Sequence, residues 1–221
     1  MFHWLEKNPF FFAVGVFVVI AFAGLIEILP NFAEASRPVV NLKPYTVLEM
    51  AGKNIYKNEN CITCHSQLIR PFKSETDRYG QVSLSGEYVY DRPFLWGSRR
   101  IGPDLHRVGN YRSTDWHENH MLDPKSVVPQ SIMPAYPYMF TKTTDIDTAY
   151  AEALTVKKVF ATPYDAPNGT KLGTLDEGRA AALEEAKAIA ADMKNKDVKD
   201  AVARGEIPQI VALIAYLNRL K

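Results

Sequence analysis

Cysteine and clustered charge are the two things this 221-residue chain has least of. Only Cys61 and Cys64 are present, and His106, His117 and His120 do not follow the spacing of a zinc finger, so the ligands for a structural zinc site are missing. The formal net charge is +1 and no block of like charge occurs, which leaves no basic surface for nucleic acid. Zinc-finger and nucleic-acid-binding classes are therefore excluded, while a 47% hydrophobic content is enough for one sizeable domain.

The two cysteines stand in the segment Cys61-Ile62-Thr63-Cys64-His65, which has the C-x-x-C-H pattern of covalent haem attachment. Two thiols at this spacing can each form a thioether with one porphyrin vinyl group, and the adjacent histidine then reaches the iron. A redox-active C-x-x-C pair is the alternative, but it gains nothing from a following histidine. The pattern predicts one covalently bound haem c, attached through Cys61 and Cys64, with His65 as an axial ligand.

A haem that transfers electrons needs a sixth ligand, and the soft sulfur of methionine favours reduced iron. Met133 is the predicted ligand because Pro134 and its neighbouring prolines stiffen the segment 129–137 around it. The other candidates are Met121 and Met139, which we expect to be packed, and Met50, which lies on the apolar face of a predicted helix. A bis-histidine haem would instead use one of the remaining histidines, namely His106, His117 or His120.

One long apolar run, Pro9 to Leu29, carries a single charge at Glu27. As a helix its 21 residues would extend about 31 Å, enough to cross a hydrocarbon core of roughly 30 Å. A cleaved signal peptide is the alternative, since Ala33-Glu34-Ala35 resembles a cleavage site, but the run is longer than a usual signal core. We therefore predict a retained single-pass helix in a lipid bilayer.

The remaining pattern is helical. A capping box at Thr46 predicts a helix that leads to Cys61, and apolar residues recur at helical spacing from Ile210 to Leu220. We expect these two helices to pack, with Gly52 allowing Tyr216 or Leu213 close to the backbone; a frayed surface helix is the alternative for this glycine. The predicted fold class is mainly α, with a transmembrane helix in residues 1–30, a proline-containing connector at 31–45 and a haem domain at 46–221.

Three segments together resemble a class I cytochrome c: the motif at Cys61, Gly102-Pro103-Asp104-Leu105, and Met133-Pro134 before a C-terminal helix. The resemblance implies a class I cytochrome c-like domain with a long insertion at residues 67–100. It also implies that the carbonyl of Pro103 accepts the ring N–H of His65, which would fix the orientation of that ring.

Further segments extend the resemblance to the monohaem subunit of cbb₃-type cytochrome c oxidases, CcoO or FixO. They are Ser66-Gln67-Leu68-Ile69-Arg70-Pro71-Phe72, Arg78-Tyr79-Gly80, Pro93-Phe94-Leu95-Trp96-Gly97-Ser98 and Ala135-Tyr136-Pro137. This resemblance is dense to about residue 140 and returns in the final helix, whereas residues 141–205 match poorly.

The resemblance implies an electron-transfer subunit that receives electrons from a dihaem c-type subunit and passes them to the haem–copper, oxygen-reducing subunit. It implies a bacterial inner-membrane protein with a cytoplasmic N-terminus and a periplasmic haem domain. A nitric oxide reductase cytochrome subunit is the alternative within electron transfer. A membrane-tethered thiol-disulfide oxidoreductase is the alternative from another class.

The insertion 67–100 combines aromatic and arginine side chains, a composition typical of interface centres. We expect it to be a docking surface, and the resemblance implies the haem–copper subunit as its target. An insertion folded on its own domain is the alternative. Arg99 or Arg100 is predicted to reach a haem propionate of that subunit. The candidate interface residues are Arg70, Trp96, Ser98, Arg99 and Arg100.

Overall fold

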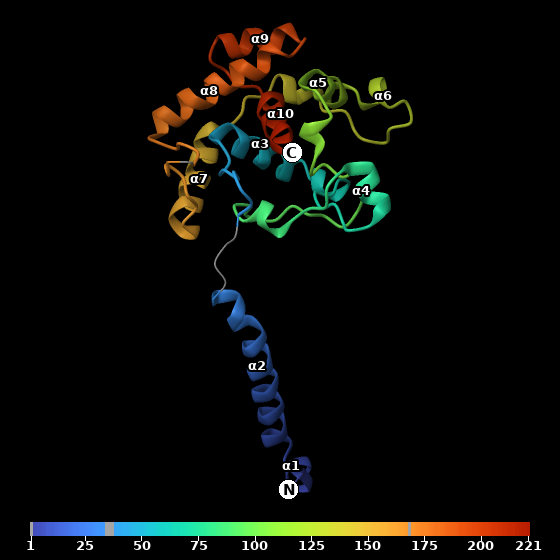
Figure 1. The fold of residues 1–221 in the computed structure, drawn as a ribbon, viewed down its shortest axis with the longest axis vertical. Coiled ribbons are helices and arrows are strands. Elements are labelled where there is room, and N and C mark those ends of the chain that lie inside the picture. Colours follow the sequence, from blue (N-terminus) through green and yellow to red (C-terminus); the bar gives the residue numbers. More distant parts are fainter. Residues whose placement is uncertain (1, 34–37, 168) are drawn as a thin grey trace. The chain divides into compact units, whose positions relative to one another are not determined.

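A computed structural model describes residues 2–33, 38–167 and 169–221 of the chain (Figure 1). It divides into two compact units, residues 1–37 and residues 38–221. The described residues are mainly helical and form no strand, with one isolated β-bridge between Thr143 and Pro208. The helices are α1 (Phe2–Lys7), α2 (Pro9–Ala33), α3 (Val47–Asn58), η1 (Cys61–Thr63), α4 (Lys73–Tyr79), η2 (Ser85–Tyr88), η3 (Val108–Asn110), α5 (Thr114–Leu122), α6 (Pro124–Val127), η4 (Pro137–Phe140), α7 (Ile146–Phe160), α8 (Leu175–Ala191), α9 (Lys196–Ala203) and α10 (Gln209–Arg219).

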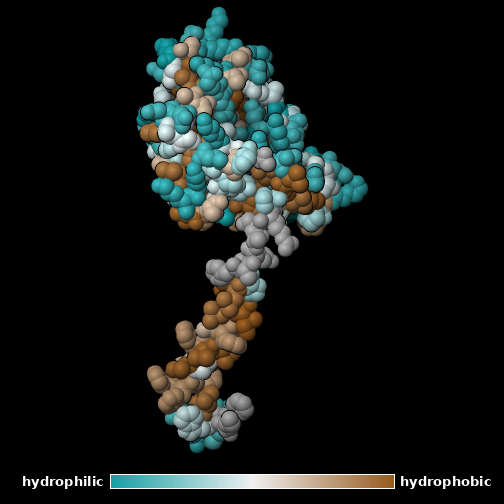
Figure 2. Space-filling view, turned by 60° about the vertical axis from the view of Figure 1, so that its left-hand side comes forward, coloured by the Kyte–Doolittle hydropathy of each residue, from teal (hydrophilic) through white to brown (hydrophobic). Residues whose placement is uncertain are grey.

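Helix α2 is the apolar helix expected from the sequence. Its stretch Pro9–Pro30 has a mean hydropathy of 2.6 and none of it is buried inside the protein, which is what a bilayer-spanning helix requires. Figure 2 shows apolar side chains along nearly all of its visible surface. The helix continues beyond the apolar run Pro9–Leu29, through Pro30, and ends at Ala33. Glu34 and Ala35 of the candidate cleavage site lie outside the described residues.

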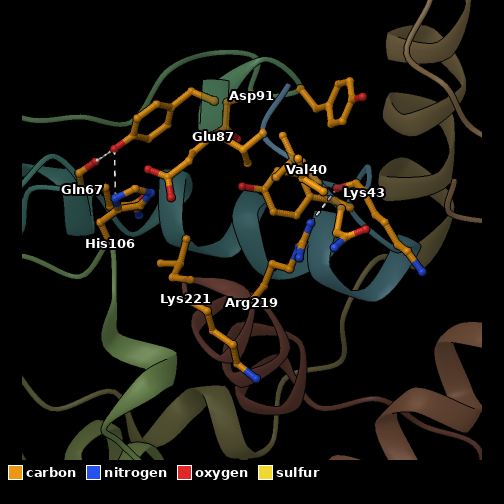
Figure 3. A pocket seen from close by; sticks show the side chains of 15 residues that line it. Val40, Lys43, Gln67, Glu87, Asp91, His106, Arg219 and Lys221 are labelled. Atoms are coloured by element: carbon orange, nitrogen blue, oxygen red, sulfur yellow. Dashed lines mark hydrogen bonds between the residues drawn. The ribbon is translucent and has the colours of Figure 1, made fainter. Parts of the chain in front are cut away.

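The predicted connector does not run free to residue 45, because its second half packs on the domain. The Val39 N–H donates to the Gly86 carbonyl at 3.2 Å, and Arg219 Nη2 donates to the Lys43 carbonyl at 2.6 Å (Figure 3). The Tyr164 hydroxyl donates to the Tyr45 carbonyl at 2.9 Å. These bonds satisfy one backbone N–H and two backbone carbonyls of the connector that an isolated segment would expose to water, so residues 38–45 belong to the larger unit.

The capping box predicted for α3 is present. Thr46 Oγ1 accepts from the Glu49 N–H at 3.1 Å, and the Thr46 N–H donates to Glu49 Oε2 at 2.8 Å. These bonds satisfy two backbone donors at the start of the helix and set where α3 begins. After the twelve residues of α3, the chain reaches the segment that contains the two cysteines.

Helices α3 and α10 pack directly against each other at the centre of the larger unit (Figure 1). Gly52 makes this approach possible, since a Cβ placed there would lie 2.7 Å from the Ala212 carbonyl carbon and 2.8 Å from Tyr216 Cβ. The predicted contact with Tyr216 is confirmed, and the frayed-helix alternative is wrong because Gly52 is buried. The Tyr216 ring then packs beside Tyr56 with centroids 5.5 Å apart.

Residues 141–205, which carry no recognisable motif, supply α7, α8 and α9 to the same core. Small residues let these helices approach closely: Ala149, Ala153 and Ala186 are fully buried. Glu118 on α5 accepts from the Lys194 and Asn195 N–H groups at 2.7 Å each, which ties the turn between α8 and α9 to α5. The segment is therefore a structural support for α3 and α10.

Gly52→Ala should destabilise the larger unit although alanine is the better helix former. The added Cβ has no room between α3 and α10, so the helices must separate, with an expected loss of about 2–3 kcal/mol in the free energy of unfolding. Chemical denaturation of the full-length protein in detergent measures it. Gly24→Ala is the matched control, because nothing lies within 4 Å of a Cβ at that position in α2. Equal stability of the two variants would refute the close contact.

Candidate functional site

The motif cysteines lie on a short turn that follows α3. Asn60 takes a left-handed conformation, with φ at 55°, and redirects the chain into η1. The Cys64 and His65 N–H groups both donate to the Cys61 carbonyl, at 3.2 and 2.9 Å. This single turn brings both thiols and the imidazole together, and both cysteines are half-buried free thiols. The geometry fits attachment of a planar group from one side.

The His65 ring is held in place from behind. Its Nδ1 lies 2.8 Å from the Pro103 carbonyl oxygen, so Nδ1 carries the proton and donates, and Nε2 is left with its lone pair. A Cβ at Gly102 would lie 2.7 Å from this Nδ1, so glycine leaves the space the ring occupies. Burial lowers the pKa of His65, which keeps the imidazole neutral and ready to bind a metal. The contact implied by the cytochrome resemblance is thus present.

Asp104, the next residue, joins the cysteine turn to the end of the insertion. Its side chain is 1% exposed. Oδ2 accepts from Ser66 Oγ at 2.7 Å and from the Leu68 N–H at 2.8 Å, while Oδ1 accepts from the His106 N–H at 2.8 Å. One carboxylate therefore fixes the chain that follows Pro103 relative to the chain that follows His65.

Backbone bonds complete this connection, which we call the Asp104 clasp and define as residues 64–68 together with residues 96–106. The Gln67 N–H donates to the Trp96 carbonyl at 2.7 Å, and the Gly102 N–H donates to the Cys64 carbonyl at 2.9 Å. Gly97 has φ at +63°, and a Cβ there would lie 3.2 Å from the His65 carbonyl oxygen. The insertion therefore ends by wrapping around the motif.

Arg100 belongs to the clasp and is not a free interface residue. Its guanidinium donates to Ser66 Oγ, the Leu68 carbonyl and Glu75 Oε2, each at 2.7 Å, and its side chain is only 18% exposed. Glu75 also accepts from Arg70, both from the side chain and from the backbone N–H at 2.8 Å. These bonds commit Arg100 to the fold, so the expectation that it reaches a partner's propionate is not met by this geometry; Arg99 is exposed.

The insertion divides into a packed half and an exposed half. Tyr88 is buried and donates from its hydroxyl to the Gln67 carbonyl at 2.7 Å. Phe94 and Trp96 instead stack at 4.6 Å between centroids and remain 47% and 38% exposed. Ser98 is exposed beside them. The insertion thus both folds on its own domain and presents an aromatic surface.

Methionine burial separates the ligand candidates. Met50, Met121 and Met139 are 4%, 8% and 0% exposed, as expected for core side chains. Met133 is half-buried and packs at the edge of the core, as do Cys61 and Tyr136. A thioether at the rim of the core is available to a bound group, whereas the three buried ones are not.

The other histidines have different surroundings. His106 Nδ1 lies 2.6 Å from Ser83 Oγ and its ring stacks on Tyr88 at 4.8 Å, so His106 is a packing residue. His117 is 2% exposed and His120 stacks on Trp116 at 4.5 Å. Burial lowers the pKa of each of these three histidines to about 4, so all are neutral at neutral pH.

The Cys61 thiol is poorly suited to redox exchange. Burial raises the pKa of Cys61 to about 12, whereas disulfide oxidoreductases need a thiolate and lower that pKa. Half-buried thiols, a neutral oriented imidazole and apolar neighbours such as Ile62 and Leu105 instead fit a haem. In the described part of the chain, no three His, Cys, Asp or Glu side chains gather as a metal site.

Comparison with protein families matches residues 2–221 to "Cytochrome C oxidase, mono-heme subunit/FixO". The chain belongs to the FixO family. It is a monohaem subunit of a cytochrome c oxidase, with a haem as its cofactor and a place among the other subunits of an oxidase complex. Comparison with curated proteins finds no match. The FixO match includes residues 141–205, which match the family poorly by their sequence motifs.

Sequence reasoning missed two site residues, Asp104 and Glu75. Asp104 stands in a quoted motif, yet its partners are mostly backbone groups, which no side-chain pattern reveals. Glu75 lies 25 residues before Arg100. One feature of the sequence could have pointed to Glu75: the insertion is rich in arginine, and an arginine that becomes buried requires a carboxylate as its counter-charge.

Glu75→Gln should change how the free energy of unfolding depends on pH. Hydrogen bonds from Arg100, above all, lower the pKa of Glu75 from 4.5 to about 2. In the unfolded chain the Glu75 carboxyl is protonated below pH 4.5, whereas in the folded protein it stays ionised down to about pH 2. The wild type therefore loses stability as the pH falls from about 4.5 to about 2. The variant should lack this loss and be about 1–3 kcal/mol less stable at neutral pH, because Arg100 loses its partner.

Denaturant unfolding at several pH values checks this expectation, with Asp77→Asn as the control. Asp77 lies on the same helix α4 and pairs with Lys73, but its side chain is 61% exposed. An exposed pair contributes roughly 0–1 kcal/mol, so the control should follow the wild type. A Glu75→Gln curve parallel to the wild type from pH 4.5 to 2 would contradict the buried network.

Proposed function

We propose that Cys61 and Cys64 bind one haem c covalently and that His65 and Met133 are its axial ligands. The main observation in support is the hydrogen bond of 2.8 Å from His65 Nδ1 to the Pro103 carbonyl oxygen, directly after the two cysteines in the chain. It leaves Nε2 as the free nitrogen of a neutral imidazole. The half-buried Met133 supports the second ligand, since it is the least buried of the methionines compared above.

When bound, the haem supplies a one-electron iron couple. The chain's own residues tune and shield it. Pro103 holds the imidazole proton on Nδ1, which raises the basicity of the ring and prevents rotation. Met133 supplies a soft sulfur, which favours the reduced metal. Leu105, Ile62 and Tyr136 pack at the edge of the same core as Cys61 and Met133, where they would offer apolar surface to the haem and limit the access of water.

The proposed role is to pass single electrons from a dihaem c-type subunit to the haem–copper, oxygen-reducing subunit. Membership in the FixO family and the apolar helix Pro9–Pro30 support this placement in a membrane oxidase. We further propose a bacterial inner-membrane location, a cytoplasmic N-terminus and a periplasmic haem domain. This chain reduces no oxygen itself.

Docking on the haem–copper subunit is proposed for the exposed aromatic surface of the insertion. The stacked pair Phe94 and Trp96 provides apolar area, and Arg92 lies 5.4 Å from the Phe94 ring centroid. Exposed aromatic and arginine side chains are the residues that dominate interface energies. Ser98 and Arg99 lie beside this pair in the sequence and are also exposed, so Arg99 replaces Arg100 as the arginine proposed to reach the partner.

Cys61→Ala combined with Cys64→Ala should yield a chain with no covalent haem. Each single variant should retain one thioether and hold haem less firmly, because these are the only thiols in the sequence. Haem-peroxidase staining of denaturing gels measures covalent attachment. A double variant that still stains would end the proposal.

Met133→His should remove the weak far-red charge-transfer band of a ferric iron–thioether bond and lower the reduction potential. The potential falls because histidine favours ferric iron more than thioether does, and axial ligands span roughly 0.8 V across haem proteins. Met121→Leu is the control, since Met121 is 8% exposed and the exchange nearly conserves volume. Loss of the band in Met121→Leu and its retention in Met133→His would assign the ligand to α5 instead.

A further inference from the structure

The loop that carries Met133, residues 129–135, has few hydrogen bonds to the rest of the larger unit. The Ser131 N–H donates to the Val128 carbonyl at 2.8 Å, and the Met133 N–H donates to Ser131 Oγ at 3.2 Å, so both bonds are local. Ile132, beside Met133, is 81% exposed. Among the described residues, no hydrogen bond ties this loop to the helices of the core. The position of Met133 therefore depends on how the two ends of the loop are held.

The end of the loop that follows Met133 is anchored in the core. The Tyr136 N–H donates to the Met121 carbonyl of α5 at 2.8 Å. The short helix η4 comes next, and its Met139 and Phe140 are 0% and 7% exposed. Tyr138 lies in the same turn but is 42% exposed, so its ring is outside the core. The packing of η4 therefore fixes where the Tyr138 side chain leaves the core.

Tyr138 connects this end of the loop to the cysteine turn. Its hydroxyl donates to Glu59 Oε2 at 2.5 Å. Glu59 ends α3 and stands two residues before Cys61. In the part of the chain that the structure describes, the Glu59 carboxylate has no other hydrogen-bond or ion-pair partner. Partial burial and the hydrogen bond to Glu59 raise the pKa of Tyr138, so the hydroxyl keeps its proton and remains the donor.

This hydrogen bond joins two parts of the chain that the proposed haem would also join. Cys61 is proposed to attach the porphyrin and Met133 to bind its iron, so the separation of these two residues has to match the haem. Thioether sulfur favours reduced iron, which makes its bond to ferric iron the weaker one. A loop already held beside the cysteine turn loses less conformational freedom when its sulfur binds, and this favours ligation.

We propose that Tyr138 and Glu59 form a latch, which holds the Met133 loop against the cysteine turn and so keeps the Met133 thioether on ferric iron. Both are positioning residues, since they act through the loop and not on the iron. The latch rests on the proposed ligation by Met133 and adds to it the contact that maintains that ligation.

Titration of the ferric full-length protein in detergent with imidazole tests the latch. Imidazole competes with Met133 for the iron, and loss of the far-red charge-transfer band measures the displacement. Tyr138→Phe keeps the ring and removes the hydroxyl that donates to Glu59. The variant should bind imidazole roughly 2- to 10-fold more tightly than wild type, as expected for the loss of one hydrogen bond.

Tyr150→Phe is the matched control. The Tyr150 hydroxyl, on α7, donates to the Gly173 carbonyl at 2.8 Å, so this variant loses a tyrosine hydrogen bond elsewhere in the same unit. Its affinity for imidazole should equal that of wild type. Glu59→Ala should reproduce the gain of Tyr138→Phe, and the double variant should gain no more than either single one, because all three lack the same bond.

Three results would overturn the latch: wild-type imidazole affinity in Tyr138→Phe, an equal gain in Tyr150→Phe, or additive gains in the double variant. The first shows that the bond does not hold the ligand, and the second that any loosening of the fold has the same effect. The third shows that Tyr138 and Glu59 act separately. A wild-type ferric spectrum without the far-red band would reject ligation by Met133 itself, so failure of the proposed ligation is distinguished from failure of the latch alone.

Discussion

The carboxylate of Asp104 is the constraint on which the haem site depends. Two thiols and a histidine on a five-residue turn supply ligands, but the turn alone does not hold the imidazole still. Asp104 fixes Ser66 and the Leu68 backbone on one side and the His106 backbone on the other. The Pro103 carbonyl is thereby positioned to accept from His65. The orientation of His65, the proposed axial ligand, thus depends on a buried acid that forms no hydrogen bond with the His65 ring.

The helix pair α3 and α10 provides the second level of support. Gly52 brings the helices close enough for Tyr216 to reach Gln67, whose backbone is bonded to Trp96 and Tyr88. Tyr216 therefore connects the packed helices α3 and α10 to the Asp104 clasp through its hydrogen bond to Gln67. The helices of residues 141–205 add buried alanines behind this pair, and the FixO match extends over this segment as well.

The sequence predicted those features that depend on local pattern. The capping box at Thr46, the close contact at Gly52 and the apolar helix from Pro9 follow from spacing and side-chain size, and the structure has all three. It did not predict the roles of Glu75 and Arg100, because an arginine beside aromatic residues has the same pattern whether it is exposed or paired. The distinction depends on a carboxylate brought near by tertiary folding, and the same holds for the backbone partners of Asp104.

The central claim is that Cys61 and Cys64 both form thioethers to a single haem. An alkaline pyridine haemochrome spectrum of the purified full-length chain, combined with protein quantitation, tests it most directly, because the visible bands of the pyridine complex report how many porphyrin vinyl groups have been saturated. The account predicts one haem per chain with both vinyl groups converted to thioethers. A spectrum with a remaining vinyl group, or a chain without haem after expression with the cytochrome c maturation machinery, would contradict it.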